Sequence, residues 1–418
     1  MKYLITGLLL LSSYQLFAGE THPSRNKKNN DNAGLTLPAG FTATVVAEGY
    51  GSVRHITLTK TGGLYAKLGK LYKGKGILYF KQSADGKLEL VSSFGKYIGT
   101  GIAIKNGYLY ASSNTEVFRY KLNDKEEVID TANPEKIITG LLDRHEHETK
   151  SIALDNNNNI YVNIGAYSNA CQVEDRKKGS PSMKPCPILD SAGGIWMFKA
   201  DQLNQTYKDG IRYATGLRNV VGLDWNTATN SLFVMQHGRD QLHDLFPEMY
   251  DTKQSAELPS ECMYEIKKGD NAGWPYIYYD HLVNKKIIAP EYGGDGKKST
   301  DEYLTPAVAF PGHLAPNGLQ FYSAKQFPDK YKNGAFIAFH GSWNRAPEPQ
   351  EGYYVAFVPF KNGKPNGKWE VFANGFAGAT ISPRGAEHRP CGLAQGPDGS
   401  LYVSDDSKGT IYKISYNK

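Results

Sequence analysis

The sequence of 418 residues has no long hydrophobic segment and no basic block. Its apolar stretch Leu4–Leu11 is too short to cross a bilayer, and no later segment approaches the roughly 18 apolar residues that a membrane helix needs. Basic residues beyond the run Arg25–Lys28 are scattered among acidic ones. We therefore expect neither a transmembrane segment nor nucleic-acid binding.

Cysteine is scarce, with four residues in the whole chain and none in a CxxC pair. This argues against a zinc ribbon, and the missing CxxCH motif excludes a covalently attached haem. A GxSxG motif is also absent, which weakens an esterase interpretation.

The N-terminus has the pattern of a secretory signal peptide. Lys2 precedes the apolar stretch, the polar pair Ser12 and Ser13 follows it, and the segment ends with the small residues Ala18 and Gly19. We expect cleavage after Ala18 and a periplasmic or secreted protein. Residues 19–35 are mostly polar and are expected to form a flexible leader, so that residues 36–418 form the folded domain.

Export makes the four cysteines candidates for two disulfides, for which three connectivities are open. Proximity in the sequence favours Cys171 with Cys186, and this pairing leaves Cys262 with Cys391.

Glycine and aromatic residues are abundant, with 44 glycines and 12% aromatics, which favours short strands joined by tight turns. A Gly- or Asn-containing turn followed by a short apolar strand recurs six times, with its aromatic residue at Tyr65, Tyr110, Tyr161, Phe233, Phe336 and Tyr402. A second short apolar strand precedes each copy. Repeats of this kind predict an all-β, six-bladed β-propeller more readily than a β-sandwich or two tandem barrels.

The two ends of the folded domain are expected to pair. The segment Phe41–Val46 alternates like a strand and is a suitable neighbour for Thr410–Ser415. Such a pair would close the ring and remove an exposed strand edge.

Residues just ahead of the upstream strands should gather at one mouth of the central channel. Each is a solvated loop residue when taken alone, but their recurrence at equivalent positions favours a shared site. A ring of Arg and His implies an anionic or metal-chelating ligand. The residues are Arg54, His55, Thr100, His147, Arg218, Asn219, His313, Asn317 and Arg389.

Several motifs in this region resemble those of the quinoprotein glucose/sorbosone dehydrogenases, in particular the sorbosone-type branch. These proteins are six-bladed propellers that use pyrroloquinoline quinone and calcium. The resemblance runs from Leu37 to the end of the chain. Its most specific parts are Gly216–Asn219, Asn271–Pro275, His340–Arg345, and Arg389–Pro390 with Gly396–Asp406.

The resemblance implies a role for individual residues. His147 matches the catalytic base, and Arg218 would stabilise charge on the quinone oxygen. The backbone carbonyls of Gly238 and Arg239 would bind calcium. The acidic neighbours of His147 are expected to raise its pKa. The expected quinone-binding residues are Arg218, Asn219, His340, Trp343, Arg345 and Arg389.

The resulting hypothesis is an exported dehydrogenase that oxidises a sugar, sugar aldehyde or polyol and passes the electrons to a separate acceptor. Two alternatives come from other classes, a non-catalytic propeller that binds carbohydrate or protein and a calcium-dependent lactonase. The arginines at the channel mouth discriminate against the lactonase, which needs carboxylate and Asn ligands there.

Overall fold

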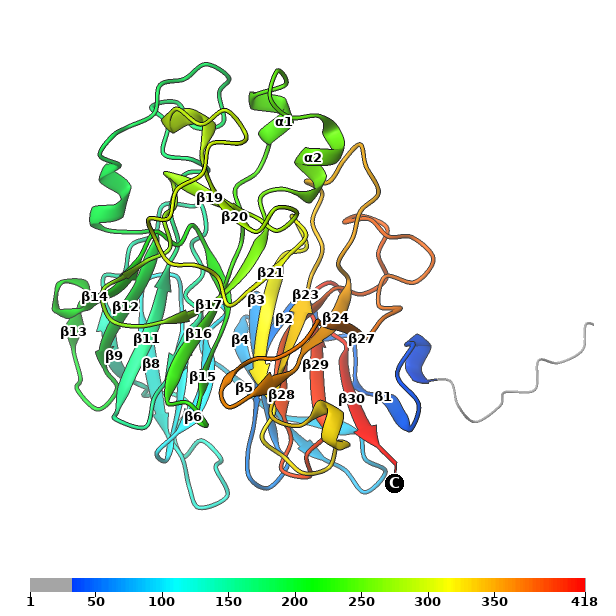
Figure 1. Ribbon diagram of the computed structural model, residues 1–418. Coiled ribbons are helices and arrows are strands. Elements are labelled where there is room, and N and C mark those ends of the chain that lie inside the picture. Colours follow the sequence, from blue (N-terminus) through cyan, green and yellow to red (C-terminus); the bar gives the residue numbers. More distant parts are fainter. Residues whose placement is uncertain (1–31, 418) are drawn as a thin grey trace, which may run out of the picture. The chain divides into compact units, whose positions relative to one another are not determined.

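Short antiparallel strands make up most of the regular structure in the computed structural model, which describes residues 32–417. Six larger sheets are found in this range, and each is a blade in which consecutive strands pair side by side (Figure 1). The predicted six-bladed β-propeller is confirmed.

The first three blades follow one another along the chain, and two of them gain a short parallel strand at the outer edge. Blade 1 contains β2 (Val53–Leu58), β3 (Leu64–Tyr72), β4 (Lys75–Gln82) and β5 (Leu88–Phe94); blade 2 contains β6 (Ile102–Lys105), β7 (Tyr108–Ser112), β8 (Val117–Lys121), β9 (Glu135–Thr139) and β13 (Gln205–Thr206); blade 3 contains β10 (Ile152–Leu154), β11 (Asn159–Ile164), β12 (Gly194–Lys199), β14 (Ile211–Thr215) and β18 (Asp270–Asn271).

The last three blades have four strands each. Blade 4 contains β15 (Val220–Asn226), β16 (Ser231–Gln236), β17 (Glu261–Ile266) and β21 (Val308–Phe310); blade 5 contains β22 (Pro316–Phe321), β23 (Ala335–Phe339), β24 (Tyr354–Val358) and β27 (Glu370–Ala373); blade 6 contains β28 (Pro390–Gln395), β29 (Leu401–Asp405), β30 (Ile411–Tyr416) and β1 (Phe41–Ala47).

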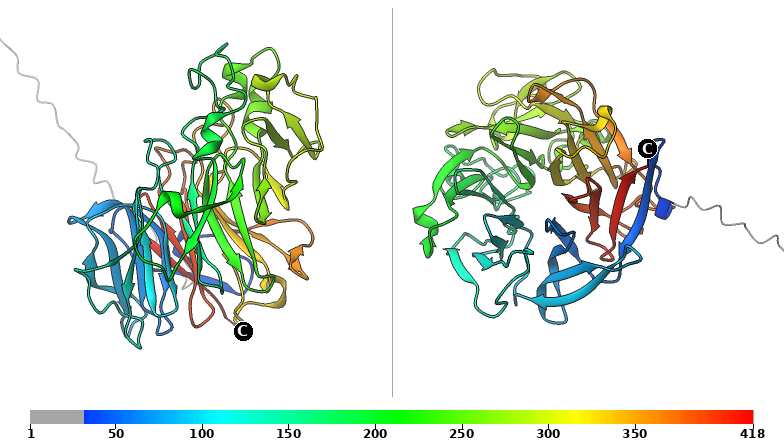
Figure 2. Two further views of the ribbon diagram at one scale, coloured as in Figure 1. Left: turned by 90° about the vertical axis from the view of Figure 1, so that its left-hand side faces the viewer. Right: turned by 90° about the horizontal axis from the view of Figure 1, so that it is seen from below.

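The innermost strands of neighbouring blades touch one another around a central channel, as the view from below shows (Figure 2). Glycine permits this close approach at two positions. A Cβ on Gly318 would lie 2.4 Å from the Cys391 carbonyl oxygen, and one on Gly392 would lie 2.3 Å from that of Arg54. The ends of the innermost strands enclose a cavity of about 310 Å³ within the channel.

The ring closes in blade 6 as predicted, because β1 pairs with β30 in antiparallel register from Phe41 opposite Tyr416 to Ala47 opposite Ile411. Phe41 fixes this pair in the core between blades 5 and 6. Its buried ring makes edge contacts with Phe327, Tyr331 and Phe372 at centroid distances of 4.9–5.3 Å.

Long insertions carry most of the non-blade structure. They contain α1 (Leu242–Leu245), α2 (Thr252–Glu257) and the hairpin of β19 (Ile277–Asp280) and β20 (Lys285–Ile288), which lie together at the top of Figure 1. A smaller hairpin, β25 (Phe360–Lys361) with β26 (Lys364–Pro365), belongs to blade 5's connections. The helix α1, which follows Asp240, is only one turn long.

The predicted disulfide between Cys171 and Cys186 is present and closes a loop in the first insertion. The pairing of Cys262 with Cys391 is wrong, because both are free, buried thiols. Cys262 lies in β17 of blade 4, whereas Cys391 lies in β28 of blade 6, and blade 5 stands between them.

The compact unit of the described structure includes Asn32 and the residues that follow it. Residues Asn32–Gly34 form a short 3-10 turn, and Leu35 is buried in the core beside it. The predicted signal peptide and most of the leader lie outside the described residues. Within residues 32–417, no helix has the length and apolar character to cross a membrane.

Candidate active site

Loops ahead of the innermost strands, together with the loops after the second strands, bring most of the expected site residues to one channel mouth. They form two linked clusters of charged side chains, one around Asp240 and one around Asp406.

Asp240 lies after β16 and is the centre of the first cluster. Its Oδ2 accepts hydrogen bonds from Arg218 Nη2 at 2.8 Å and pairs with Arg176 Nη2 at 3.0 Å. Its Oδ1 accepts from Asn344 Nδ2 at 2.7 Å and lies 3.8 Å from His313 Nδ1. Burial alone would raise the pKa of Asp240, but Arg218, His313 and Arg176 hold this pKa well below its usual value. Asp240 is therefore an ionised anchor for the surrounding cations.

Arg218 precedes β15 and is almost completely buried. Besides its pair with Asp240, its Nη1 donates to the Gly238 carbonyl at 2.8 Å. Its neighbour Asn219 is also buried, with Oδ1 3.5 Å from Asn163 Nδ2. The guanidinium is thus fixed by contacts with the loop after β16.

His147 lies in the loop before β10, with its Nδ1 2.5 Å from the Ala166 carbonyl oxygen. A carbonyl only accepts, so Nδ1 carries the proton and Nε2 keeps its lone pair. Burial and the nearby Arg218 lower the pKa of His147 to about 3. The expected rise of this pKa is wrong, because Glu146 approaches no nearer than 4.0 Å and its effect is outweighed.

Asp406, which follows β29, is the centre of the second cluster. Its Oδ1 accepts from His340 Nε2 at 2.6 Å, and its Oδ2 accepts from Arg54 Nη1 at 3.3 Å. Although burial opposes ionisation, His340 and Arg54 lower the pKa of Asp406. Arg389 donates to the backbone carbonyls of His340 and Gly341, so the three blades 1, 5 and 6 share one polar network.

Contacts with two buried glutamate side chains hold the segment Gly238–Arg239, which is proposed to bind calcium, in place. Glu261 accepts from the Gly238 N–H at 2.9 Å, and burial raises the pKa of Glu261 to about 8. The Arg239 guanidinium turns away to Glu291, with Nη1 2.5 Å from Oε1. His237 next to it is uncharged at neutral pH, because burial and Arg218 lower its pKa to about 3.

Trp343 and Arg345 of the His340–Arg345 motif differ from the other expected quinone-binding residues. Trp343 is 57% exposed and lies at the rim, beside His243 and Asp244. Arg345 is buried, and its donors reach Pro349, Ala256 and Gly312 carbonyl oxygens and the Glu257 carboxylate at 2.7–3.1 Å. The guanidinium of Arg345 is therefore occupied by protein acceptors.

The arrangement fits an anionic cofactor together with a cation. Arg218 Nε and His237 Nε2 are buried and have no hydrogen-bond partner among residues 32–417. The buried Arg218 Nε–H requires an acceptor. His237 is uncharged, so its Nε2 donates or accepts a hydrogen bond according to the tautomer. The Gly238 carbonyl keeps one lone pair after its bond with Arg218, and neither Arg239 nor His237 places an unpaired positive charge beside it.

Sequence reasoning missed Asp240, Arg176, Glu261 and the pairing of Asp406. Asp406 ends the Gly396–Asp406 motif and Asp240 directly follows Gly238–Arg239, but only the fold shows which arginine each one meets. Arg176 comes from the disulfide-closed insertion, where no pattern in the sequence indicates a contact with the channel mouth.

Comparison with known proteins supports the resemblance. An uncharacterised protein of Borreliella burgdorferi is 26% identical over 99% of this chain and 97% of its own length. A pyrroloquinoline quinone-dependent sugar dehydrogenase of Hypocrea jecorina is 22% identical over 99% of this chain and 97% of its length. A pyrroloquinoline quinone-dependent pyranose dehydrogenase of Coprinopsis cinerea is 23% identical over 91% of this chain, a match that spans 54% of that protein.

Solved structures show the same fold. The holo form of the Coprinopsis cinerea pyranose dehydrogenase PQQ domain superposes with a TM-score of 0.70 at 21% identity, covering 91% of this chain and 97% of that one. The calcium structure of a Trichoderma reesei family AA12 protein gives a TM-score of 0.73 at 18% identity, covering 92% and 97%.

The model of the TrAA12-like family matches residues 35–417, which is nearly the whole described structure. The resemblance to quinoprotein sugar dehydrogenases is confirmed by this match and by the relatives named above. The chain therefore belongs to the TrAA12-like family.

Proposed function

We propose that this protein is a dehydrogenase that oxidises a sugar, sugar aldehyde or polyol with bound pyrroloquinoline quinone and calcium. The relatives named for quinone-dependent sugar oxidation support this proposal. The observation that carries it is His147, a neutral imidazole of fixed tautomer beside a buried arginine.

His147 is the general base in this proposal. Nε2 keeps its lone pair because Nδ1 carries the proton, and it would accept the proton of a substrate hydroxyl. The hydrogen bond to Ala166 keeps the ring in one orientation. Because its pKa is about 3, the imidazole is uncharged throughout the neutral range.

The basic residues of the mouth would hold the quinone. Arg218, Arg389, Asn219 and His340 offer donors to its carboxylates and carbonyl oxygens, while the carbonyls of Gly238 and Arg239 would bind calcium. When bound, the quinone supplies the hydride acceptor and calcium the Lewis acid. The Asp240 carboxylate keeps Arg218 in place.

The protein is further proposed to act outside the cytoplasm and to pass electrons to a separate carrier. The disulfide between Cys171 and Cys186 supports an oxidising compartment. A lactonase is disfavoured, because Asp240 and Asp406 at the mouth are both paired with arginines.

The test is reconstitution of the purified apoprotein with quinone and calcium, followed by absorption spectra and dye reduction with a panel of aldoses, sugar aldehydes and polyols. We expect quinone binding and turnover. His147→Ala should bind quinone and lose turnover by about 10²- to 10⁴-fold, as expected for removal of a general base. His145→Ala is the matched control, since that ring is 92% exposed.

Failure to bind quinone would overturn the proposal. Binding without turnover on any substrate would favour a non-catalytic carbohydrate-binding propeller. Unchanged turnover in His147→Ala would show that another group takes the proton.

A further inference from the structure

A second concave site lies outside the channel mouth, between the disulfide-closed loop and the β19–β20 insertion. It is a cleft of about 580 Å³, within the range of ligand-binding pockets. Its walls include three tyrosines and three charged residues, Tyr276, Tyr292, Tyr303, Lys184, Lys298 and Glu302. None of these residues belongs to the clusters around Asp240 and Asp406.

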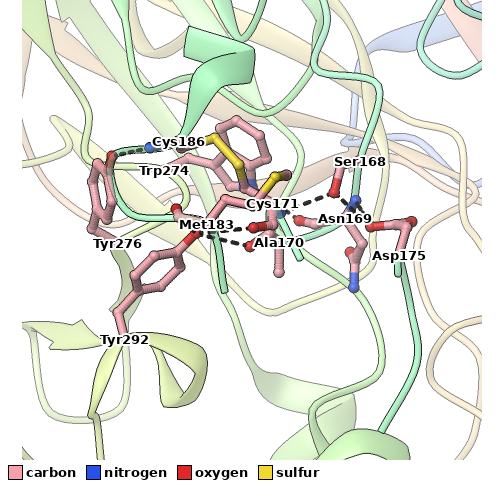
Figure 3. The surroundings of a disulfide bond; sticks show 10 residues. All are labelled: Ser168, Asn169, Ala170, Cys171, Asp175, Met183, Cys186, Trp274, Tyr276 and Tyr292. Carbon is pink, nitrogen blue, oxygen red and sulfur yellow. Dashed lines mark hydrogen bonds between the residues drawn. A yellow bond between two sulfur atoms is a disulfide. The ribbon is translucent and has the colours of Figure 1, made fainter. Parts of the chain in front are cut away.

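Two of the three tyrosine rings, those of Tyr276 and Tyr292, are fixed in place through their hydroxyl groups. The Tyr276 hydroxyl accepts from the Cys186 N–H at 2.8 Å, next to the disulfide. The Tyr292 hydroxyl lies 3.2 Å from the Ala170 carbonyl and 3.3 Å from that of Met183, which come from the two sides of the same loop (Figure 3). Because the protein occupies the polar ends of Tyr276 and Tyr292, the faces of these two rings remain for a ligand, and the two side chains have little freedom left to lose on binding.

The rings also present surfaces in different directions. The Tyr276 and Tyr303 planes are nearly parallel, at 17° with centroids 6.4 Å apart, whereas Tyr292 stands edge-on to Tyr276 at 76° and 4.9 Å. A ligand in the cleft therefore meets apolar ring surface on more than one side.

Charged groups of both signs border this aromatic surface. Neither Lys184 nor Lys298 has an ion-pair partner among residues 32–417, and Glu302 adds an exposed carboxylate. Hydrogen-bond donors and acceptors next to aromatic faces match a molecule with apolar C–H faces and a rim of hydroxyl groups. A saccharide has this chemistry. A phosphate-bearing ligand would be expected to recruit arginine forks, which the cleft lacks.

The cleft is connected to the channel mouth through one short stretch of chain. Asn169 exchanges two hydrogen bonds with the backbone of Asp240, at 2.8 Å and 3.0 Å, and its carbonyl accepts from Trp274 Nε1 at 2.9 Å. Cys171 of the disulfide follows two residues later (Figure 3). The loop that contacts the Asp240 cluster thus also forms a wall of the cleft.

We propose that this cleft is a saccharide-binding subsite separate from the channel mouth. As a subsite for longer substrates it rests on the proposed sugar oxidation, but its ability to bind a saccharide does not. A saccharide longer than one sugar unit is the expected ligand.

The binding test uses the apoprotein, so that it does not depend on quinone. The apoprotein is titrated by calorimetry with cellopentaose, xylopentaose and maltopentaose. Glucose serves as the monosaccharide for comparison, and adenosine triphosphate serves as the nucleotide for comparison. We expect at least one pentasaccharide to bind, and Tyr303→Ala to weaken it about tenfold through loss of a stacking surface. Tyr303→Phe keeps the ring and should bind like the wild type.

Two further variants distinguish a loss of binding at the cleft from a general loss of stability. Tyr72→Ala removes a half-buried tyrosine of blade 1, away from the cleft, and should leave binding unchanged. Lys298→Ala, at an exposed position, gives a second cleft variant if Tyr303→Ala lowers the thermal midpoint. Dye reduction with a monosaccharide should be the same in all these variants.

The outcomes separate the two proposals. Pentasaccharide binding lost in Tyr303→Ala, with monosaccharide oxidation intact, supports both. Binding without any oxidation supports the subsite and overturns the enzyme assignment. No pentasaccharide binding to the wild type, equal binding by the cleft variants, or binding of the nucleotide alone overturns the subsite.

Discussion

Arg389 and Arg345 differ in their hydrogen-bond partners, and these partners decide whether each guanidinium is available to a ligand. Arg389 donates to backbone carbonyls of the His340–Gly341 turn, and no carboxylate lies within ion-pair distance of it among residues 32–417. Arg345 uses its donors on three carbonyls and on Glu257. Arg389 therefore has no carboxylate in direct contact within the described part of the chain, although it helps to lower the pKa of Asp406, and its guanidinium is available to an anion. The guanidinium of Arg345 stabilises the loops.

Arg345→Ala is expected to destabilise the protein. Removing the guanidinium leaves buried carbonyls without donors and Glu257 without its cation, so the free energy of unfolding should fall by about 3 kcal/mol. Chemical denaturation measures this change. Arg144→Ala, at an exposed position, is the control and should change it by less than about 0.5 kcal/mol.

The same variant distinguishes the structural role from the cofactor role that the sequence suggested. If the folded fraction of Arg345→Ala binds quinone with unchanged affinity, the residue is structural. A loss of quinone affinity with an unchanged free energy of unfolding would show that Arg345 binds the cofactor.

At the level of elements, the blades and the insertions are stabilised in different ways. Blade strands have continuous ladders of hydrogen bonds and bury their apolar residues between neighbouring blades. Within residues 32–417, the insertion between β11 and β12 has only one isolated bridge, Gln172 with Ser182, and is stabilised further by the disulfide and by side-chain bonds such as that of Tyr276.

Removal of the disulfide should lower the free energy of unfolding by an amount that can be estimated from the length of the loop it closes. Cys171 and Cys186 are 15 residues apart, and closing such a loop stabilises by about 3 kcal/mol in the chain-entropy model. The double variant Cys171→Ser/Cys186→Ser should lose about this much free energy of unfolding. Adding a reductant should lower the stability of the wild type and leave that of the double variant unchanged; equal sensitivity of both would contradict the prediction.

For the whole described unit, closure of the ring is the feature on which the site depends. Residues Arg54 and Asp406 come from blades 1 and 6, which stay adjacent because β1 completes blade 6. An open ring would separate the clusters that surround the mouth. Ring closure and cofactor binding should therefore be lost together.

Phe41→Ala tests this connection. The substitution removes the ring that anchors β1 among Phe327, Tyr331 and Phe372, and we expect a loss of about 3–5 kcal/mol in unfolding free energy. Thr44→Ala, at an exposed position of the same strand, should have little effect. Urea unfolding followed by tryptophan fluorescence measures both, and a loss below about 1 kcal/mol for Phe41→Ala would show that β1 is not needed for closure.

Much of the fold could be predicted because each blade repeats the same local pattern. The strand that contains Tyr65 and the strand that contains Tyr402 both follow a Gly-containing turn, and both are second strands of a blade. The insertions have no repeat, so neither the β19–β20 hairpin nor the tyrosine cleft could be predicted. The free Cys262 and Cys391 were mispaired because the sequence does not show which blades are neighbours.

The sequence by itself determined the number of blades, the ring closure and which blade starts carry basic residues, since these follow from local strand and turn preferences. Only the tertiary structure decided the partners and the charge states. Asp240 meets Arg218 and Arg176, and His147 stays neutral, because burial and charges from segments far apart in the sequence set the pKa values there. Electrostatic interactions act through space, and the sequence does not give the distances between residues of different blades.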